Sequence, residues 1–279
     1  MLYVNKNGLL SVPKVVQSVK ILSMSKAKCD IRIGTSGWHY SDWAGRFYPA
    51  DLPKSKWLEY YAEHFDTVEI NNTFYRQPKP ETFTNWHKQA PKNFLYTVKA
   101  NRYITHIKRL KEAEEPLERF FEGVRLLKSN LGPILYQLPP SMHKDLDRLK
   151  AFLKVLPKKL IAVFEFRHES WFSEDAYELL KEFNAGFCIH DFVDVPRIVT
   201  SDVIYLRFHG TTGRYQGSYS KSALRDWANW VKDNIKGKKA FFAYFNNDYN
   251  AYAVHNAKTL KEQFRKHHQT KQRTKGRND

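Results

Sequence analysis

The stretch IAVFEFRHESWF, residues 161–172, decides the fold because it begins as a buried β-strand and nevertheless carries charge. Glu165 and Arg167 are two residues apart, so both side chains point to the same face of an extended chain. Phe164 and Phe166 point to the other face. A buried ionised group is costly unless it is paired. The strand must therefore have an apolar environment on one face and a polar environment on the other.

The length and composition limit the class of protein. A chain of 279 residues can form one large α/β barrel or two ordinary domains. Hydrophobic residues at 42% and aromatic residues at 15% supply a sizeable core and exclude disorder of the whole chain. No apolar run approaches the roughly 20 residues that a membrane span needs. Cys29 and Cys188 match no metal or redox spacing, which indicates reduced thiols in a cytoplasmic protein.

The formal net charge of +17 is concentrated at the two ends of the chain. Residues 1–28 hold five lysines and no acid, and residues 258–279 hold eight Lys or Arg against two acids. We expect residues 1–28 to be a flexible extension with Met24 as the natural start, 29–265 to form the barrel domain, and 266–279 to be a disordered basic tail. Such ends can contact nucleic-acid phosphates without sequence specificity, or act only as solubilising segments.

Short β-rich runs alternate with amphipathic helical patterns from Asp30 onward. The predicted strands are residues 31–37, 67–74, 95–101, 132–139, 161–168, 186–191, 203–210 and 239–247. This alternation predicts a single (β/α)₈ barrel of the TIM type. Residues 192–202 are too short and too interrupted by proline for a full helix, so we expect a degenerate crossover between strands six and seven.

In such a barrel, one face of each strand packs on helices and the other points into the barrel. The sets expected to face helices are apolar: Val68, Ile70, Val98, Phe164, Phe166, Leu206 and Phe208. The opposite sets are polar and lie near the carboxyl ends of the strands: Glu69, Asn71, Lys99, Asn101, Gln137, Glu165, Arg167, Arg207 and His209. Strand six can direct either His190 or Asp191 into the barrel, but not both, because adjacent side chains of a strand point to opposite faces. Repetition over five strands favours a ligand site at the C-terminal mouth over isolated structural ion pairs.

Five inward residues are the catalytic candidates, namely Glu69, Lys99, Glu165, Arg167 and His209. Glu69 and Glu165 can serve as general acid and base if neighbouring cations push their pKa values apart. Lys99 is a Schiff-base nucleophile or, the reading we favour, the ion-pair partner of a glutamate. His209 is a proton-transfer group or a satisfied structural histidine.

We expect specific pairings for the two charged residues of the opening stretch. Glu165 is expected to face Lys99 or Arg207 from other strands. Arg167 is expected to meet Glu69 or Asp191. If these pairs serve a ligand and not the core, Glu165→Gln abolishes activity or binding at little expense in stability, because the amide keeps the volume of the carboxylate.

Substrate-binding candidates surround these groups. They are Asn71, Tyr75, Gln137, Arg207, Gly213, Arg214, Asn246 and Asp248. The amides suit hydroxyl groups or a base edge, and the glycine-rich loop 209–220 suits an anion, because barrel loops after strands seven and eight often bind phosphate. The alternative is an ordinary flexible loop. Aromatic residues after strands one, two and five either stack on a ligand or cap the barrel.

No cofactor is predicted. A divalent metal is the alternative, with Glu69, Glu165, His209 and Asp248 as its ligands. Lys99, Arg167 and Arg207 weigh against it because they would repel a cation.

Eight ordered motifs make the chain resemble the YecE-like family of uncharacterised proteins over about residues 31–265. They are GTSGW (34–38), W-x-G-x-FYP (43–49), VEINNTFYRQP (68–78), ITH (104–106), QLPP (137–140), EFRHESWF (165–172), YLRFHG (205–210) and YFNND (244–248). The resemblance implies a TIM-barrel fold and no established activity.

Three functions remain open from the sequence. The first is an enzyme that uses acid–base chemistry on a small anionic, phosphorylated or sugar-like molecule. The second is a nucleic-acid-processing enzyme whose basic ends hold the phosphate backbone. The third is a non-catalytic receptor for a ligand or a nucleic acid, which would bind without turnover.

Overall fold

Eight parallel strands form a nearly closed barrel in the computed structural model, which describes residues 29–213 and 215–275, with side chains as far as Arg265. The strands are β1 Asp30–Thr35, β2 Thr67–Ile70, β3 Leu95–Lys99, β4 Leu131–Gln137, β5 Ala162–Glu165, β6 Gly186–His190, β7 Val203–Phe208 and β8 Ala240–Phe245. All eight predicted strands are confirmed. Their order is β1-β8-β7-β6-β5-β4-β3-β2, and a single bridge between Ser36 and Glu69 joins β1 to β2.

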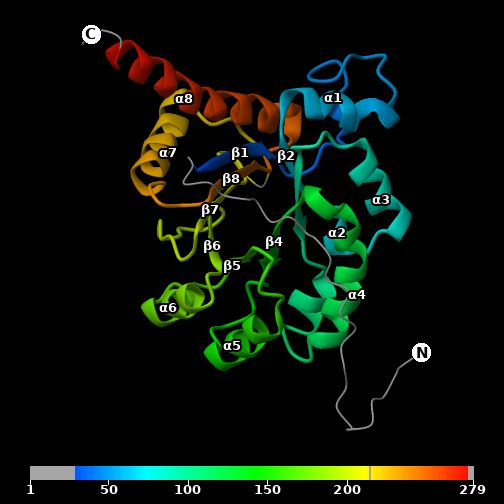
Figure 1. The fold of residues 1–279 in the computed structure, drawn as a ribbon, viewed down its shortest axis with the longest axis vertical. Coiled ribbons are helices and arrows are strands. Elements are labelled where there is room, and N and C mark those ends of the chain that lie inside the picture. Colours follow the sequence, from blue (N-terminus) through cyan, green and yellow to red (C-terminus); the bar gives the residue numbers. More distant parts are fainter. Residues whose placement is uncertain (1–28, 214, 276–279) are drawn as a thin grey trace.

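Helices surround the barrel, as the labelled ribbon shows (Figure 1). They are α1 Trp57–His64, α2 Asn72–Tyr75, α3 Pro80–Gln89, α4 Glu114–Val124, α5 Leu146–Val155, α6 Glu174–Glu182, α7 Lys221–Asn234 and α8 Tyr252–Lys275. Their apolar stripes face the sheet, as in α4, where Leu117, Phe120 and Val124 are buried. This arrangement confirms the predicted TIM-type barrel.

The buried apolar residues form two clusters that separate the faces of the sheet. The larger cluster lies between strands and helices and includes Val68, Phe164 and Phe166. The smaller cluster fills the barrel with inward-facing side chains, which are Leu95, Leu135, Val163, Cys188, Val203, Tyr205, Ala240, Phe242 and Tyr244. The predicted parity of the strands is therefore confirmed.

The connection between β6 and β7 contains no helix in residues 191–202, all of which are described, and this confirms the degenerate crossover. Val195, Ile198 and Val199 pack against the core in place of a helix. The Thr200 hydroxyl accepts a hydrogen bond from the Phe187 N–H at 2.8 Å. Side-chain hydrogen bonds thus fasten an extended segment where the other units use a helix.

The last helix, α8, continues to Lys275 and so extends into the segment 266–279 that we expected to be disordered. Among its described side chains, Ala257, Leu260 and Phe264 form a buried inner face. The expected N-terminal extension 1–28 and residues 276–279 lie outside the described residues. The division of the chain into these three parts stays a prediction.

Candidate active site

The C-terminal mouth, the end of the barrel where the strands finish, contains an ion-pair network around Arg207. Arg207 lies on β7, and its side chain is 1% exposed. Its Nη2 contacts Glu69 Oε1 on β2 at 2.8 Å, and its Nη1 contacts Glu165 Oε2 on β5 at 2.6 Å. Both carboxylates are fully buried. The predicted pairing of Glu165 with Arg207 is confirmed.

Glu69 also accepts hydrogen bonds from two neutral hydroxyl groups. Ser36 Oγ, just beyond β1, donates to Oε1 at 2.6 Å, and Tyr205 Oη on β7 donates to Oε2 at 2.5 Å. Together with Arg207, these donors engage both oxygens of the carboxylate. Ser36 and Tyr205 were not among the sequence candidates, although Tyr205 shares the inward parity of Arg207.

Arg167 leaves the end of β5 and turns back to its own strand. Its Nε and Nη2 donate to Glu165 Oε1, and Nη2 also donates to Nε2 of His209 at 3.2 Å. Its guanidinium lies 4.0 Å from the ring centroid of Phe192. The expectation that Arg167 meets Glu69 or Asp191 was wrong, because the guanidinium reaches the carboxylate two residues earlier. Its Nη1 has no hydrogen-bond acceptor among the described residues.

The hydrogen bonds of His209 fix its tautomer. Nδ1 lies 3.1 Å from Asp191 Oδ1 and donates to it, so Nε2 carries the lone pair and accepts from Arg167 and from Arg207 Nη1 at 3.3 Å. Burial lowers the pKa of His209 to about 4, and Arg207 acts in the same direction against Asp191. A neutral histidine between two guanidinium groups fits the structural alternative better than proton transfer.

Strand β6 contributes both of its polar residues, so the expectation of only one was wrong. His190 is buried, and its Nε2 donates to the Phe166 carbonyl at 2.8 Å. Asp191 follows directly and accepts from the backbone N–H of His209 at 2.7 Å and from the Tyr219 hydroxyl. The strand ends at His190, so the parity rule no longer holds for Asp191.

Lys99 ends β3 at the mouth and is partly buried. In the described part of the chain its ammonium has no ion pair and no hydrogen bond; it lies 4.3 Å from the ring centroid of Phe74. Burial lowers the pKa of Lys99 to about 8, and the charge of Arg207 adds to the shift against Glu165 and Glu69. The partnership with a glutamate that we favoured from the sequence is absent, because both carboxylates are taken by arginines.

Asp248 lies beyond the end of β8 and also has an altered pKa. Burial raises the pKa of its carboxyl group to about 6, and Asp42 acts in the same direction. The carboxylate influences Tyr40, whose hydroxyl donates to the Ser36 carbonyl at 2.5 Å beside Glu69. The sequence predicts Asp248 as a binding residue or a metal ligand, and its partial burial does not follow from the sequence.

The amide candidates lie at the ends of β2, β4 and β8. Asn71 follows β2 and has a buried Oδ1 without a hydrogen-bond donor. Gln137 and Asn246 have no side-chain hydrogen bond to the residues that the structure describes, and Asn246 is 8% exposed. These amides are therefore available to a ligand.

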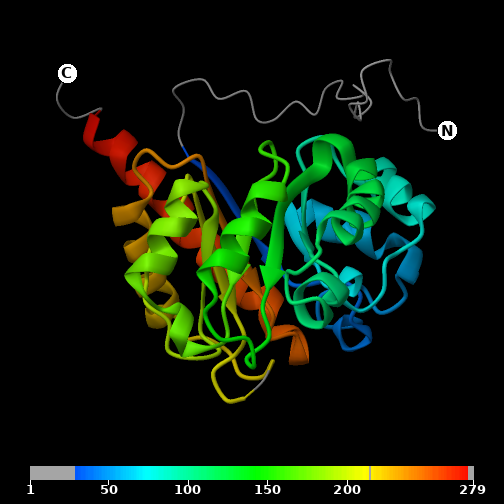
Figure 2. The same cartoon turned by 90° about the horizontal axis from the view of Figure 1, so that it is seen from below.

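The remaining binding candidates belong to the surface of the mouth. Tyr75 is 73% exposed at the end of α2. Gly213 is exposed, with a φ of 145° that disfavours any side chain, and Figure 2 shows its loop, in yellow, at one end of the barrel. Arg214 lies outside the described residues.

The alternative metal ligands do not form a cation site. Glu69, Glu165 and His209 each face a guanidinium group, and among the described residues no hydrogen bond or ion pair joins Asp248 to them. No group of three His, Cys, Asp or Glu able to hold a metal ion occurs within the described ranges. The donors present therefore fit an ion-pair network and not a divalent cation.

The large aromatic residues after strands one and five pack the barrel and are not a binding rim. Trp38, Trp43 and Trp171 are buried, and Trp171 stacks on Phe166 with 4.5 Å between ring centroids. Tyr75 stays a candidate for stacking on a ligand, since its ring is exposed.

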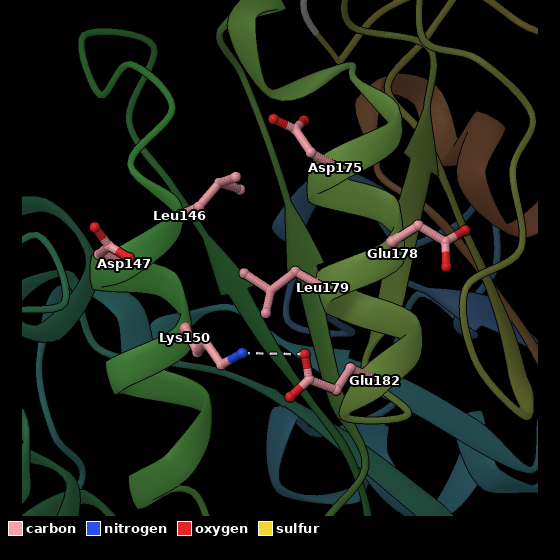
Figure 3. Close-up of a pocket in the computed structure, with 7 residues that line it drawn as sticks. All are labelled: Leu146, Asp147, Lys150, Asp175, Glu178, Leu179 and Glu182. Atoms are coloured by element: carbon pink, nitrogen blue, oxygen red, sulfur yellow. Dashed lines mark hydrogen bonds and ion pairs between the residues drawn. The ribbon is translucent and has the colours of Figure 1, made fainter.

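A hollow of about 570 Å³ lies on the helical side, between α5 and α6, away from the strand ends. Its lining residues are Leu146, Asp147, Lys150, Asp175, Glu178, Leu179 and Glu182. Figure 3 shows Lys150 of α5 reaching Glu182 of α6, 3.3 Å away. Asp175, Glu178 and Glu182 each form an ion pair with a lysine at the surface, so we place the chemistry at the mouth and not here.

The fold and the mouth define a TIM-barrel protein with a charged and partly unsatisfied C-terminal site. The sequence matches the family described as "Protein of unknown function DUF72" over residues 32–278, and the chain belongs to this family. The expected relationship to YecE-like proteins is thereby confirmed.

The names of the relatives state no activity. The chain is 28% identical to UPF0759 protein YunF of Bacillus subtilis over 267 residues, 83% of this chain and 94% of that protein. It is 30% identical to UPF0759 protein YecE of Escherichia coli over 149 residues, about half of each chain (53% and 52%). A DUF72 family protein of Thermotoga maritima has a TM-score of 0.78 at 30% identity and covers 85% of this chain and 99% of its own.

A second solved structure supports the fold alone. A DUF72 family protein of Enterococcus faecalis gives a TM-score of 0.72 at 22% identity, covering 84% of this chain and 94% of its own. Within residues 29–213 and 215–275, no helix has the length and apolar character required to cross a membrane.

Proposed function

We propose that this protein is an enzyme that performs acid–base chemistry on a small anionic substrate at the mouth of the barrel. The observation that carries the proposal is Lys99, whose ammonium group stands without a carboxylate partner among the described residues in a partly buried position. An unpaired cation in such a place is costly unless a ligand supplies the negative partner. A substrate anion would pair with the ammonium group in this way.

Two groups with opposite pKa shifts suit the proton transfers. The pKa of Lys99 is lowered to about 8 by burial, and that of Asp248 is raised to about 6 by burial. Acid and base catalysts work best with pKa values near the working pH. In this role Asp248 accepts the proton and Lys99 donates it.

Arg167 supports the anionic character of the substrate. Its Nη1 is unengaged within the described chain, while Nε and Nη2 are held by Glu165. A guanidinium oriented in this way presents a fixed donor to a carboxylate or phosphate. The buried Asn71 Oδ1 that lacks a donor is suited to a hydroxyl group of the same molecule.

The test is a turnover assay by NMR and mass spectrometry with small phosphates, sugar phosphates and hydroxy acids. The expected pH profile is a bell: the rate rises as Asp248 loses its proton near pH 6 and falls as Lys99 loses its proton near pH 8. Lys99→Met and Asp248→Asn should lower kcat at least about a hundredfold. The control is Lys92→Met, which replaces an exposed lysine just before β3 and should leave kcat unchanged.

Binding of an anion without turnover in any assay would contradict an enzyme and support the receptor function. A pH profile that is flat between pH 5 and 9 would remove Lys99 and Asp248 from the chemistry.

A second candidate, nucleic-acid processing, is favoured by the exposed tyrosines of the mouth. They come from the loops after β2, β3, β7 and β8, and they are Tyr75, Tyr103, Tyr215 and Tyr249. Arg76 and Arg102 stand beside two of them in the sequence. Interleaved aromatic and basic side chains suit single strands, whose bases stack and whose phosphates pair with cations.

The two candidates differ in their dependence on salt. Binding of a fluorescent single-stranded oligonucleotide that weakens steeply between 50 and 200 mM salt, on the order of 10³-fold for several phosphate contacts, would support nucleic-acid processing. The Tyr103→Ala variant should then bind more weakly than the wild type. Absence of binding at 50 mM salt rejects this candidate.

A further inference from the structure

We propose that Lys99 acts as a nucleophile whose Nζ forms an imine with the carbonyl carbon of an anionic aldehyde or ketone. The proposal rests on the proposed function and names its substrate class, which acid–base chemistry alone leaves open. It makes Lys99 a covalent catalyst in place of a proton donor. Because the neutral amine is then the reactive form, the rate would rise, and not fall, as Lys99 loses its proton.

The first support is the isolation of Lys99 in a mouth where the two glutamates, Glu69 and Glu165, already have arginine partners. Glu69 is bound by Arg207, Ser36 and Tyr205. Glu165 is bound by Arg167 and Arg207. Neither carboxylate is therefore left to hold the ammonium, and the Nζ is directed over the ring of Phe74, 4.3 Å away.

The second support is the environment that activates lysine nucleophiles. A lysine amine becomes reactive when it is desolvated or lies near another cation, because both effects favour its neutral form. Lys99 meets both conditions, through its burial and through the charges of Arg207 and Arg167. With a pKa of about 8, roughly a tenth of the amine is neutral at pH 7, against less than about a thousandth for an ordinary lysine.

The third support is the position of an anion site in the same mouth. Arg167 is anchored by Glu165 and by the face of Phe192, and its Nη1 remains free of acceptors in the described residues. His106, near Lys99, adds no positive charge, since burial and then Lys99 lower its pKa to about 4. A carboxylate or phosphate would thus be drawn to Arg167 while the carbonyl group meets Lys99.

The reaction balances without an outside acid, oxidant or reductant. The neutral amine of Lys99 attacks the carbonyl carbon, the C=O π pair moves to oxygen, and the proton released on deprotonation of the ammonium joins that oxygen. The carbinolamine then loses its hydroxyl group with one nitrogen proton as water. An ammonium and a carbonyl compound become a protonated imine and one water, with the same charge on both sides.

The protonated imine explains how one lysine could serve acid–base chemistry. Its positive nitrogen accepts electrons through the C=N bond, so a C–H or C–C bond at the carbon next to the imine carbon breaks more easily, and the electron pair forms an enamine. Asp248, with its pKa near 6, is the base of the mouth that would accept the proton. The ion-pair network of Arg207 then holds the walls of the site in place.

The experiment is reductive trapping of the full chain with dihydroxyacetone phosphate and, separately, with pyruvate, in the presence of sodium borohydride. Hydride from borohydride converts the imine to a stable secondary amine, which peptide mass spectrometry locates. We expect labelling of Lys99 at pH 7.5 at least tenfold faster than labelling of the exposed Lys92. Lys99→Arg, which keeps the charge, should abolish the adduct, and circular dichroism checks that this variant is folded.

The outcomes separate the imine from the proposed function. No adduct on Lys99 with either compound, or equal labelling of Lys99 and Lys92, overturns the imine. Turnover of an anionic substrate that borohydride leaves unaffected also overturns it, while the acid–base enzyme stands. An adduct on Lys99 in a protein that turns over no substrate supports the imine and counts against the enzyme.

Discussion

The carboxylate of Glu165 is fully buried and accepts hydrogen bonds from two guanidinium groups. Burial alone would raise its pKa, but Arg167 and Arg207 outweigh that effect and hold the pKa of Glu165 well below its usual range. The residue therefore stays ionised, and its negative charge is what makes two buried arginines tolerable.

The first prediction concerns the removal of that charge. Glu165→Gln leaves Arg167 and Arg207 short of a negative partner in a buried place, so we expect a loss of about 3–5 kcal/mol in the free energy of unfolding. This revises the small loss that the sequence alone suggests, since the pair is more deeply buried than a ligand site exposed to water. Urea unfolding measures it.

The matched control is Glu178→Gln, which removes a carboxylate from an exposed ion pair with Lys181. That variant should unfold like the wild type. If Glu165→Gln is as stable as the wild type, the network serves only a ligand, as we expected from the sequence.

The second prediction is the acid dependence of this contribution. The folded-state pKa of Glu165 is lowered relative to about 4.3 in the unfolded chain, so its stabilisation is fully present above that pH and is lost as the pH falls through the folded-state pKa. Urea unfolding from pH 6 to pH 3 should show the wild type losing stability more steeply than Glu165→Gln. If the free energies of unfolding of the two proteins fall in parallel as the pH falls, the lowered pKa of Glu165 is contradicted.

Strand parity explains which site residues could be predicted. Glu69, Glu165 and Arg207 alternate with apolar neighbours, so their inward direction follows from the sequence. The partner of Arg167 could not be predicted, because a long side chain reaches along its own strand or across to others. Ser36 escaped notice for another reason: a lone hydroxyl is as common on a surface as in a site.

At the scale of elements, the barrel closes where β1 meets β2. A single bridge, from Ser36 to Glu69, joins them in the described part of the chain. The Tyr61 hydroxyl adds a link, because it accepts from the Thr35 N–H at 3.0 Å and donates to the Thr67 carbonyl at 3.1 Å. Gly34 makes this junction feasible, because a Cβ there would collide with the Thr67 carbonyl.

The third prediction tests this junction. Gly34→Ala should destabilise the fold by about 1–3 kcal/mol in thermal or urea unfolding, because the new methyl group meets backbone and forces the strands apart. Gly186→Ala on β6 is the matched control: its methyl group meets the Val163 side chain at 3.2 Å, which can shift, so its loss should be smaller. If both variants lose equal stability, the junction is not specially tight.

The crossover between β6 and β7 shows what the sequence could and could not supply at this scale. Pro196 and the short spacing excluded a full helix correctly. The hydroxyl of Thr200, which accepts from Phe187 and donates to the Ala185 carbonyl at 2.7 Å, could not be foreseen. Such contacts depend on the path of an irregular segment, and the hydrophobic periodicity of the sequence does not predict that path.

At the scale of the whole molecule, charge and packing are divided between different parts of the chain. Phe264 is the last residue of the chain described as buried, and residues 266–279 hold five Lys or Arg and one acid. Such a basic segment can attract phosphates over a distance set by the salt concentration.

The last prediction separates these two contributions by deleting residues 266–279. The melting temperature should stay within about 2 °C of the wild type, because the deletion keeps the described buried residues of α8, which include Ala257, Leu260 and Phe264. Affinity for a single-stranded oligonucleotide at 50 mM salt should fall, and the slope of log K against log salt should become shallower by roughly 0.7 for each phosphate contact removed. A full-length variant with the five basic residues changed to glutamine should reproduce the loss of affinity. A large fall in melting temperature on deletion, without such a fall in the glutamine variant, would show that the end of α8 supports the barrel by packing and not by charge.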